Sequence, residues 1–223
     1  MLAARVVDGG WRLQVDSNEA DEVAPDIDAW ARAHGFQPSE QQIGGSTPLL
    51  RLGVSDVTAT AYLGPVGEHQ ALLSEFSIGS PGFSDAFGGS GTASTWFTLL
   101  LFSVDASRIH RLTIHPSNFS DRDWVGRLLR QDRRIDQISP EFDERYRVIA
   151  STDASSDRIA AFLDNAFVAW LLAQGELAID VEDHGEHGGY LMVARVGIGL
   201  ADADLDALRS QAEHVASHAR TTL

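Results

Sequence analysis

The spacing of apolar residues changes partway along this chain, and that change constrains the fold more than any other sequence feature. In the first half, apolar residues repeat at every second position, as in residues 56–63 and 69–78, which is the period of a half-buried strand. In the second half they recur at three- and four-residue intervals, the period of an amphipathic helix. The sequence therefore predicts an α+β fold, in which an antiparallel β-rich N-terminal half packs with a helix-richer C-terminal half.

Strands are expected where alternating apolar residues lie between turn-forming residues. Near the N-terminus, residues 6–7 and 11–15 flank Asp8-Gly9-Gly10, whose glycines permit the positive φ angles of a tight hairpin. A nearly continuous apolar run over residues 96–104 predicts a strand with both faces covered. The remaining expected strands span residues 56–63, 69–78, 110–115, 145–150, 177–181 and 190–196.

Helices are expected where apolar residues share one helical face behind a capping residue. Ser155 or Ser156, for example, can cap a helix that carries Ile159 and Phe162 on one face. The last of the expected helices is long and amphipathic. The expected helices span residues 25–35, 120–129, 155–163, 165–173 and 202–220.

The boundary between the two halves is expected in the charged and polar segment 130–140, which has the composition of a linker. Residues 1–130 then form a β-rich half with one early helix, and residues 140–223 form an α+β half. The segment 79–95 is rich in Gly and Ser and predicts a long loop. We expect the two halves to share a core and to form one compact unit.

Charge limits the partners of the chain. Its 223 residues include 32 acidic and 17 basic side chains, for a formal net charge of −15. A negative field of this size repels nucleic acid and anionic lipid, so neither is an expected partner. A protein partner, or association with a second copy, stays open.

Two missing residue types exclude several kinds of chemistry. All the basic residues are arginines, so a Schiff-base lysine and a phosphate-binding P-loop lysine are both excluded. There is no cysteine, which excludes disulfides, thiolate nucleophiles and cysteine-ligated metals. No cofactor is predicted.

The sequence also bears on location. The longest purely apolar run near the middle of the chain, residues 99–102, is far shorter than the roughly 20 residues that a membrane-spanning helix needs. Residues 1–15 lack the basic and apolar regions of a signal peptide. The cytoplasm is therefore the expected location.

Histidines provide the candidate metal ligands. His214 and His218 stand four residues apart on the terminal helix, so both rings can project from one face. His184 and His187 lie in an acidic turn, where nitrogen and carboxylate donors could collect a divalent cation. The alternative for each pair is an ordinary surface role: solubility for the turn, and attraction to the negative end of the helix dipole for His214 and His218.

Other polar groups could line a cleft between the two halves. His110, His115 and Asp105 stand at the ends of expected strands and are the candidates for such a site. The glycine-rich segment 88–92 leads into a strand rather than a helix, so it is not expected to bind phosphate. No catalytic residue is assigned.

One region resembles a known group of sequences. Its motifs are Ser139-Pro140-Glu141-Phe142-Asp143-Glu144-Arg145-Tyr146-Arg147-Val148 with Asp153, the later Trp170-Leu171-Leu172, and Trp30-Ala31 with Gly35-Phe36. These are similar to motifs in uncharacterised conserved proteins of high-GC Gram-positive bacteria, from residue 28 to the C-terminus. The resemblance implies a strand followed by helices and a strand hairpin. Members often carry membrane helices near the N-terminus, and the resemblance assigns no catalytic residue.

Three functions fit these observations. The first is a non-catalytic interaction or scaffold protein, supported by the acidic charge and the lack of a recognisable catalytic arrangement. The second is a small-molecule-binding protein or enzyme with a cleft between the halves. The third is a metal-dependent hydrolase built on the two histidine pairs. Whether the protein is an enzyme stays open at this point.

Overall fold

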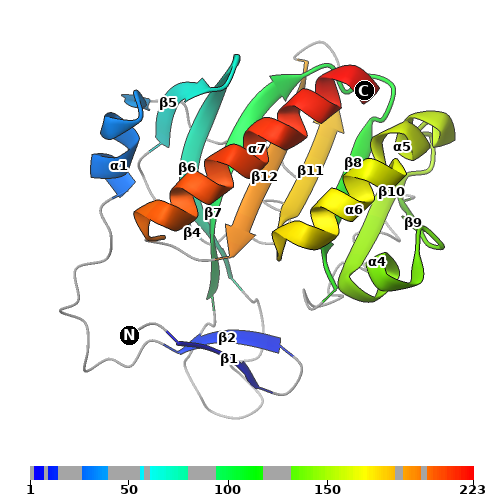
Figure 1. Ribbon diagram of the computed structural model, residues 1–223, viewed down its shortest axis with the longest axis horizontal. Helices are drawn as coiled ribbons and strands as arrows, with labels where there is room; N and C mark the ends of the chain where they lie inside the picture. The colour runs from blue at the N-terminus through cyan, green and yellow to red at the C-terminus, as the bar shows by residue number, and fades with distance from the viewer. Residues whose placement is uncertain are drawn as a thin grey trace.

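Figure 1 shows a computed structural model of the chain, in which helices lie over one face of a large antiparallel sheet. The residues that the structure describes are 3–7, 10–14, 27–39, 56–57, 61–79, 94–117, 132–183, 188–196 and 200–223. The helix expected over residues 120–129 and most of the loop expected over residues 79–95 lie outside these residues.

The sheet has ten strands, and the described pairs in it are all antiparallel. Nine strands follow the order β3-β5-β6-β7-β12-β11-β8-β10-β9, and β4 pairs with β6. Their bounds are β3 Gln37–Ser39, β4 Asp56–Val57, β5 Ala61–Val66, β6 His69–Gly79, β7 Ser94–Val104, β8 Arg111–Pro116, β9 Asp132–Ile135, β10 Tyr146–Ser151, β11 Ala178–Asp183 and β12 Gly189–Val196. The predicted N-terminal hairpin is confirmed as β1 (Ala3–Val7) paired with β2 (Gly10–Gln14).

Two strands from late in the chain are inserted between earlier strands of this sheet. β12 pairs along its length with β7, and β11 pairs with β8, so two late strands lie between two early ones. The α+β prediction is confirmed, including the long terminal helix. The described strands form one continuous sheet that runs across the two expected halves.

Helices cover one face of the sheet (Figure 1). α7 crosses the middle strands, α6 and α5 lie beside it over the strands toward β9, and α1 lies at the β5 edge. The bounds are α1 Ile27–Ala33, α4 Pro140–Arg145, α5 Ser156–Phe162, α6 Asn165–Gln174 and α7 Asp202–Thr222. Among the described helices, none has the length and apolar character needed to cross a membrane.

Both faces of the sheet are buried at its centre. Leu99 and Leu100 are neighbours on β7 and so point to opposite faces, yet each is at most 1% exposed. This confirms the prediction of a strand covered on both sides. On the helical side, the apolar stripe of α7 packs into the core, with Leu205, Leu208 and Val215 all buried. That burial is the main source of stability for a helix of this composition.

The segment around residue 142 corrects one expectation. No helix was expected over residues 140–145, but they form α4, and the strand expected over residues 145–150 starts at Tyr146 as β10. Phe142, Tyr146 and Val148 therefore lie on two different elements. Local signals favour the helix: the Ser139 hydroxyl accepts a hydrogen bond from the Phe142 amide at 3.2 Å, and Pro140 occupies the first turn. All three aromatic and aliphatic side chains still reach the core.

The expected linker over residues 130–140 is also corrected. Its residues Asp132–Ile135 form the edge strand β9, which pairs with β10. The strand was not predicted because three of its four residues are charged, which is also typical of a linker. Charged side chains protect an edge strand from pairing with other chains.

Candidate functional site

A row of polar side chains crosses the sheet on the face away from the helices. Glu182 on β11 stands opposite Tyr190 on β12 and Arg111 on β8. Ser151 on β10 stands opposite Asp132 on β9. Together these five residues, which we call the Arg111 ladder, extend over five neighbouring strands.

Ion pairs and hydrogen bonds join four members of the Arg111 ladder, while the Ser151 hydroxyl donates to the Ile109 carbonyl. Arg111 Nη1 donates to both carboxylate oxygens of Asp132 at 2.8 and 2.9 Å, and Arg111 Nη2 lies 3.5 Å from Glu182 Oε1. Tyr190 Oη donates to Glu182 Oε2 at 2.6 Å. The Arg111, Asp132 and Glu182 side chains are 16%, 6% and 5% exposed, so water screens these charges weakly.

The charge on Arg111 is secured by its neighbours. Burial acts to lower the pKa of its guanidinium, but the nearby carboxylates of Asp132, Glu182 and Asp180 outweigh it, and the pKa is raised above its ordinary value. Asp180, one row along, accepts a hydrogen bond from Thr113 Oγ1 at 2.7 Å. Arg111 therefore keeps its positive charge, and the ion pairs and hydrogen bonds of the ladder join β8, β9, β11 and β12.

Glu182 is one of the acidic residues next to the turn expected at His184 and His187. The structure places it inside β11, buried and bonded within the Arg111 ladder. His184 and His187 lie outside the described residues, so a metal site there stays a prediction. No described group of three His, Asp or Glu residues has an arrangement that could hold a metal ion.

The three cleft candidates do not gather at one place. His110 directly precedes β8 and His115 lies near its far end, so about 17 Å of extended chain separates them. His110 Nδ1 lies 3.5 Å from Asp183 Oδ2, while the buried His115 has Nδ1 3.0 Å from the Pro116 carbonyl. Asp105 accepts a hydrogen bond from the Ser107 amide, and hydrogen bonding to Ser107 lowers the pKa of its carboxyl group.

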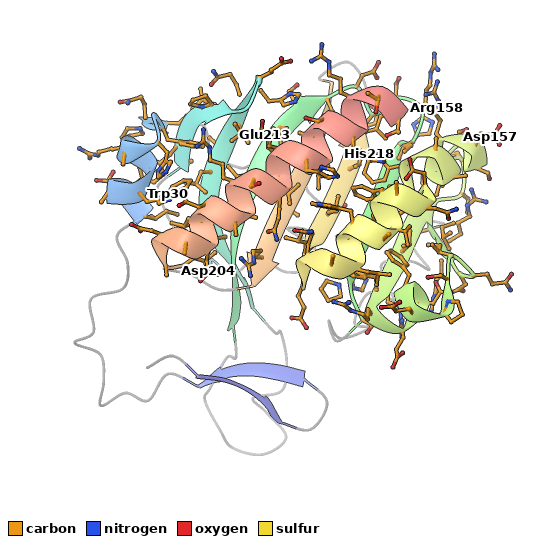
Figure 2. All side chains as sticks on the ribbon, in the orientation of Figure 1. Trp30, Asp157, Arg158, Asp204, Glu213 and His218 are labelled. Carbon is orange, nitrogen blue, oxygen red and sulfur yellow. The ribbon has the colours of Figure 1, made fainter. Side chains whose placement is uncertain are left out.

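His214 and His218 lie in the seam between α7 and the shorter helices. The His214 ring stacks on Trp170 with centroids 4.1 Å apart, and the His218 ring stacks on Phe167 at 4.4 Å. Figure 2 shows His218 on the side of α7 that faces α5 and α6. The two rings thus form part of an aromatic stack that joins α6 to α7.

His218 forms a hydrogen bond within the protein, and the His214 ring packs against Trp170. His218 Nε2 lies 2.8 Å from the carbonyl of Phe162, the last residue of α5, and only a donor nitrogen satisfies a carbonyl. Burial against Trp170, helped by nearby His218, lowers the pKa of His214. The expected attraction to the helix dipole is therefore not what governs His214, which stands more than one turn from the end of α7.

Helix α6 presents a surface without charge. Residues 165–174 contain no acidic or basic side chain, and Phe167, Val168 and Leu171 fill the inner face. Ala166, Ala169 and Ala173 are exposed on the outer face. Trp170 flanks them toward α7, and Leu172 flanks them toward α4; both are partly buried. We call these five outer residues the α6 face.

Acidic residues dominate the border of the α6 face. Asp164 caps the start of α6, where its carboxylate accepts a hydrogen bond from the Phe167 amide at 2.8 Å. Glu144 and Glu176 lie exposed near its end. On the α4 side, the Arg145 guanidinium donates to the Leu172 carbonyl at 2.6 Å, so part of its hydrogen-bonding capacity is used within the protein.

A shallow hollow of about 300 Å³ lies beside the end of α6. At its base the Tyr146 hydroxyl donates a hydrogen bond to the Gly175 carbonyl, and burial raises the pKa of that phenol, so it stays protonated as a donor. The hollow is lined by Pro116, Ser117, Glu144, Arg145, Tyr146 and Glu176. Two carboxylates and one guanidinium give it a net negative charge.

Comparison of the chain with protein-family models, with curated proteins and with solved structures found no match. Sequence reasoning recognised the histidine pair of α7 and the Trp170-Leu171-Leu172 motif separately. It did not foresee that Trp170 and His214 meet, because that contact depends on how α6 packs beside α7.

Proposed function

We propose that this protein is a non-catalytic interaction protein of the cytoplasm that binds a partner protein through the α6 face. The observation that carries the proposal is the uncharged outer surface of α6 on a chain with net charge −15. No nucleic-acid partner is part of the proposal, because the same charge repels phosphate backbones.

An uncharged apolar surface on a strongly charged protein is typical of an interface. The cores of protein interfaces are depleted in charged residues and enriched in aromatic ones, and Trp is among the commonest residues whose loss weakens binding. The α6 face combines three exposed alanines with the partly exposed Trp170. Small side chains let a partner helix approach closely, while Trp170 supplies contact area.

Charge identifies the kind of partner. A second copy of this chain would bring its own net charge of −15 and set Asp164, Glu144 and Glu176 against like charges, which opposes self-association. A helix with an apolar face and flanking Lys or Arg residues matches both the uncharged centre and the acidic border. One basic side chain of that helix can enter the hollow beside Tyr146.

The buried polar groups support a non-catalytic role. Arg111, Asp132, Glu182 and Tyr190 bind one another across the sheet. His218 is engaged with α5 and Phe167. These side chains stabilise strands and helices, which is the ordinary function of buried hydrogen-bonded charges.

Site-specific photo-crosslinking in cells that make the protein naturally tests this proposal. A photoreactive amino acid replaces Ala169 in one variant and Ala203, an exposed alanine of α7, in a matched control. We expect a discrete crosslinked protein from position 169 that is absent from position 203. Mass spectrometry should place the crosslink in an apolar segment flanked by basic residues.

Two results would overturn the proposal. One is equal crosslinking from positions 169 and 203, which would show only random collision. The other is a crosslink from position 169 to a second copy of this chain, which would replace the basic partner with self-association.

A further inference from the structure

The seam between α6 and α7 changes character along its length. The two helices lie side by side, and toward the middle of α6 aromatic rings close the seam, as in the stack of His214 on Trp170 (Figure 1). At the end of α6 two amide side chains meet instead, Gln174 from α6 and Gln211 from α7. The α6 face therefore borders a polar end of this seam.

Gln211 is the one polar residue among the buried residues of α7; the others are Leu, Ala and Val. It is 8% exposed, and its Nε2 atom donates to the backbone carbonyl and to the Oε1 atom of Gln174, each at 3.4 Å. Its own Oε1 atom is buried, and no donor within the described part of the chain reaches it. A buried carbonyl without a donor is unfavourable, so an apolar residue of similar size would suit the folded protein better at this position.

The hydrogen bonds that close this end of the seam are long. Gln174 Nε2 lies 3.3 Å from the Trp170 carbonyl, and the two contacts from Gln211 to Gln174 are 3.4 Å. Strong hydrogen bonds from amide nitrogen to oxygen measure roughly 2.7–3.2 Å, so these contacts are weak. Gln174 is also only partly buried. Its side chain can therefore turn away from Gln211 at little cost and let a donor reach Gln211 Oε1 from the surface.

The surroundings favour a donor that carries a positive charge. α6 has no charged side chain of its own, and its C-terminal end bears the partial negative charge of the helix dipole. Glu176, two residues beyond Gln174, is exposed. Arg209 of α7 donates to the Pro65 carbonyl, on the side of α7 away from α6. Hydrogen bonds from ammonium and guanidinium groups are also stronger than those from neutral donors.

We propose that Gln211 accepts a hydrogen bond from a Lys or Arg side chain of the partner helix, which enters the polar end of the seam. The inference rests on the proposed function, because it adds one specific contact to docking at the α6 face. When the partner binds, the Gln174 side chain turns aside and the incoming cation donates to Gln211 Oε1. The hollow beside Tyr146 lies on the α4 side of the same helix end, so basic side chains of the partner contact both sides of α6.

The Gln211→Met variant tests the inference, because Met has a similar size and helix propensity but no acceptor carbonyl. Two properties are measured: the melting temperature of the free protein, and the yield of the crosslink from a photoreactive residue at position 169 in cells. We expect a melting temperature that is equal or higher, since a buried acceptor without a donor is removed. The crosslink yield should fall about tenfold, as loss of a hydrogen bond to a charged group predicts. Ser210→Ala, at an exposed position of α7, is the control and should change neither property.

An undiminished crosslink from position 169 in Gln211→Met would overturn the contact and leave docking at the α6 face standing. A melting temperature lowered by more than about 4 °C would also overturn it, because Gln211 would then be satisfied inside the protein. Failure of docking itself has a different signature. Positions 169 and 203 would then crosslink equally while Gln211 is unchanged, and the contact would be lost together with the surface.

Discussion

Arg111 shows how one residue can determine the pairing of several strands. Its guanidinium binds Asp132 and Glu182, which come from β9 and β11 on either side of β8 and β10. Because all three side chains are nearly inaccessible to water, removing the arginine leaves two buried carboxylates without their shared cation. Loss of one member of a buried charge pair is far more costly than loss of an exposed pair.

We therefore expect Arg111→Met to lower the free energy of unfolding by about 3 kcal/mol. Arg134→Met is the matched control, since Arg134 lies on the same part of the sheet but is 40% exposed, and its pair with Asp136 should contribute no more than about 1 kcal/mol. Urea denaturation of the three proteins measures both differences. Equal effects for Arg111 and Arg134 would contradict a structural role for the ladder.

Gly64 tests how closely the chain packs at the β5 edge. A Cβ atom at this position would overlap the ring of Phe36 and lie 2.7 Å from the Phe36 Cα, so backbone atoms would have to move. We expect Gly64→Ala to destabilise the protein by about 2 kcal/mol, as overpacking does. Thermal or urea unfolding measures the change.

Gly175 provides the comparison for Gly64. It has a φ of 82°, and a Cβ atom there would meet nothing within 4 Å. Its ψ of −154° completes a backbone conformation that only glycine adopts readily, so Gly175→Ala should cost about 1–3 kcal/mol through backbone strain, without any new contact. A loss below about 0.5 kcal/mol for Gly64→Ala would show that the contact with Phe36 is looser than described.

At the scale of elements, α6 depends on its first turn. The helix has only ten residues and no charge pairs, so the cap formed by Asp164 is a large part of its local stabilisation. We expect Asp164→Ala to cost about 1 kcal/mol and Asp164→Asn, which can cap equally well, to cost almost nothing. Denaturation curves of the two variants distinguish capping from the effect of charge.

The sequence predicted elements well where local signals and periodicity agree. α1 was expected over residues 25–35 and lies at Ile27–Ala33, and Gly35, the last residue of the expected range, has a φ of 83°. β9 was missed because its charged residues resemble a linker, and α4 was missed because the aromatic residues around position 142 also fit a strand pattern. In both places a neighbouring strand or a cap decides the structure, and alternation alone does not reveal it.

The candidate site was predictable only in parts. The charge-free segment and the pair formed by His214 and His218 are visible in the sequence, but which side of α6 faces outward depends on packing against the sheet. The same holds for Glu182, whose role depends on its position opposite Arg111 across the sheet. The order of strands in the sheet determines which residue lies opposite Glu182, and local composition does not reveal that order.

At the scale of the whole molecule, a sheet that is buried on both faces at its centre supports one uncharged helical surface. The ladder and the core give stability, and the proposed function assigns the α6 face to a basic partner. We therefore expect substitutions on the α6 face to weaken binding without lowering stability, and substitutions in the ladder to lower stability. Screening by salt should also weaken binding, because the partner is expected to be basic.

The affinity of the crosslinked partner for two charge-matched variants tests this account most directly. Ala169→Glu and Ala203→Glu each add one negative charge to an exposed helical alanine, and only the first lies on the α6 face. Calorimetric titration should show at least about a tenfold loss of affinity for Ala169→Glu and an unchanged affinity for Ala203→Glu, with both variants fully folded. Equal affinities for the two variants would contradict the account.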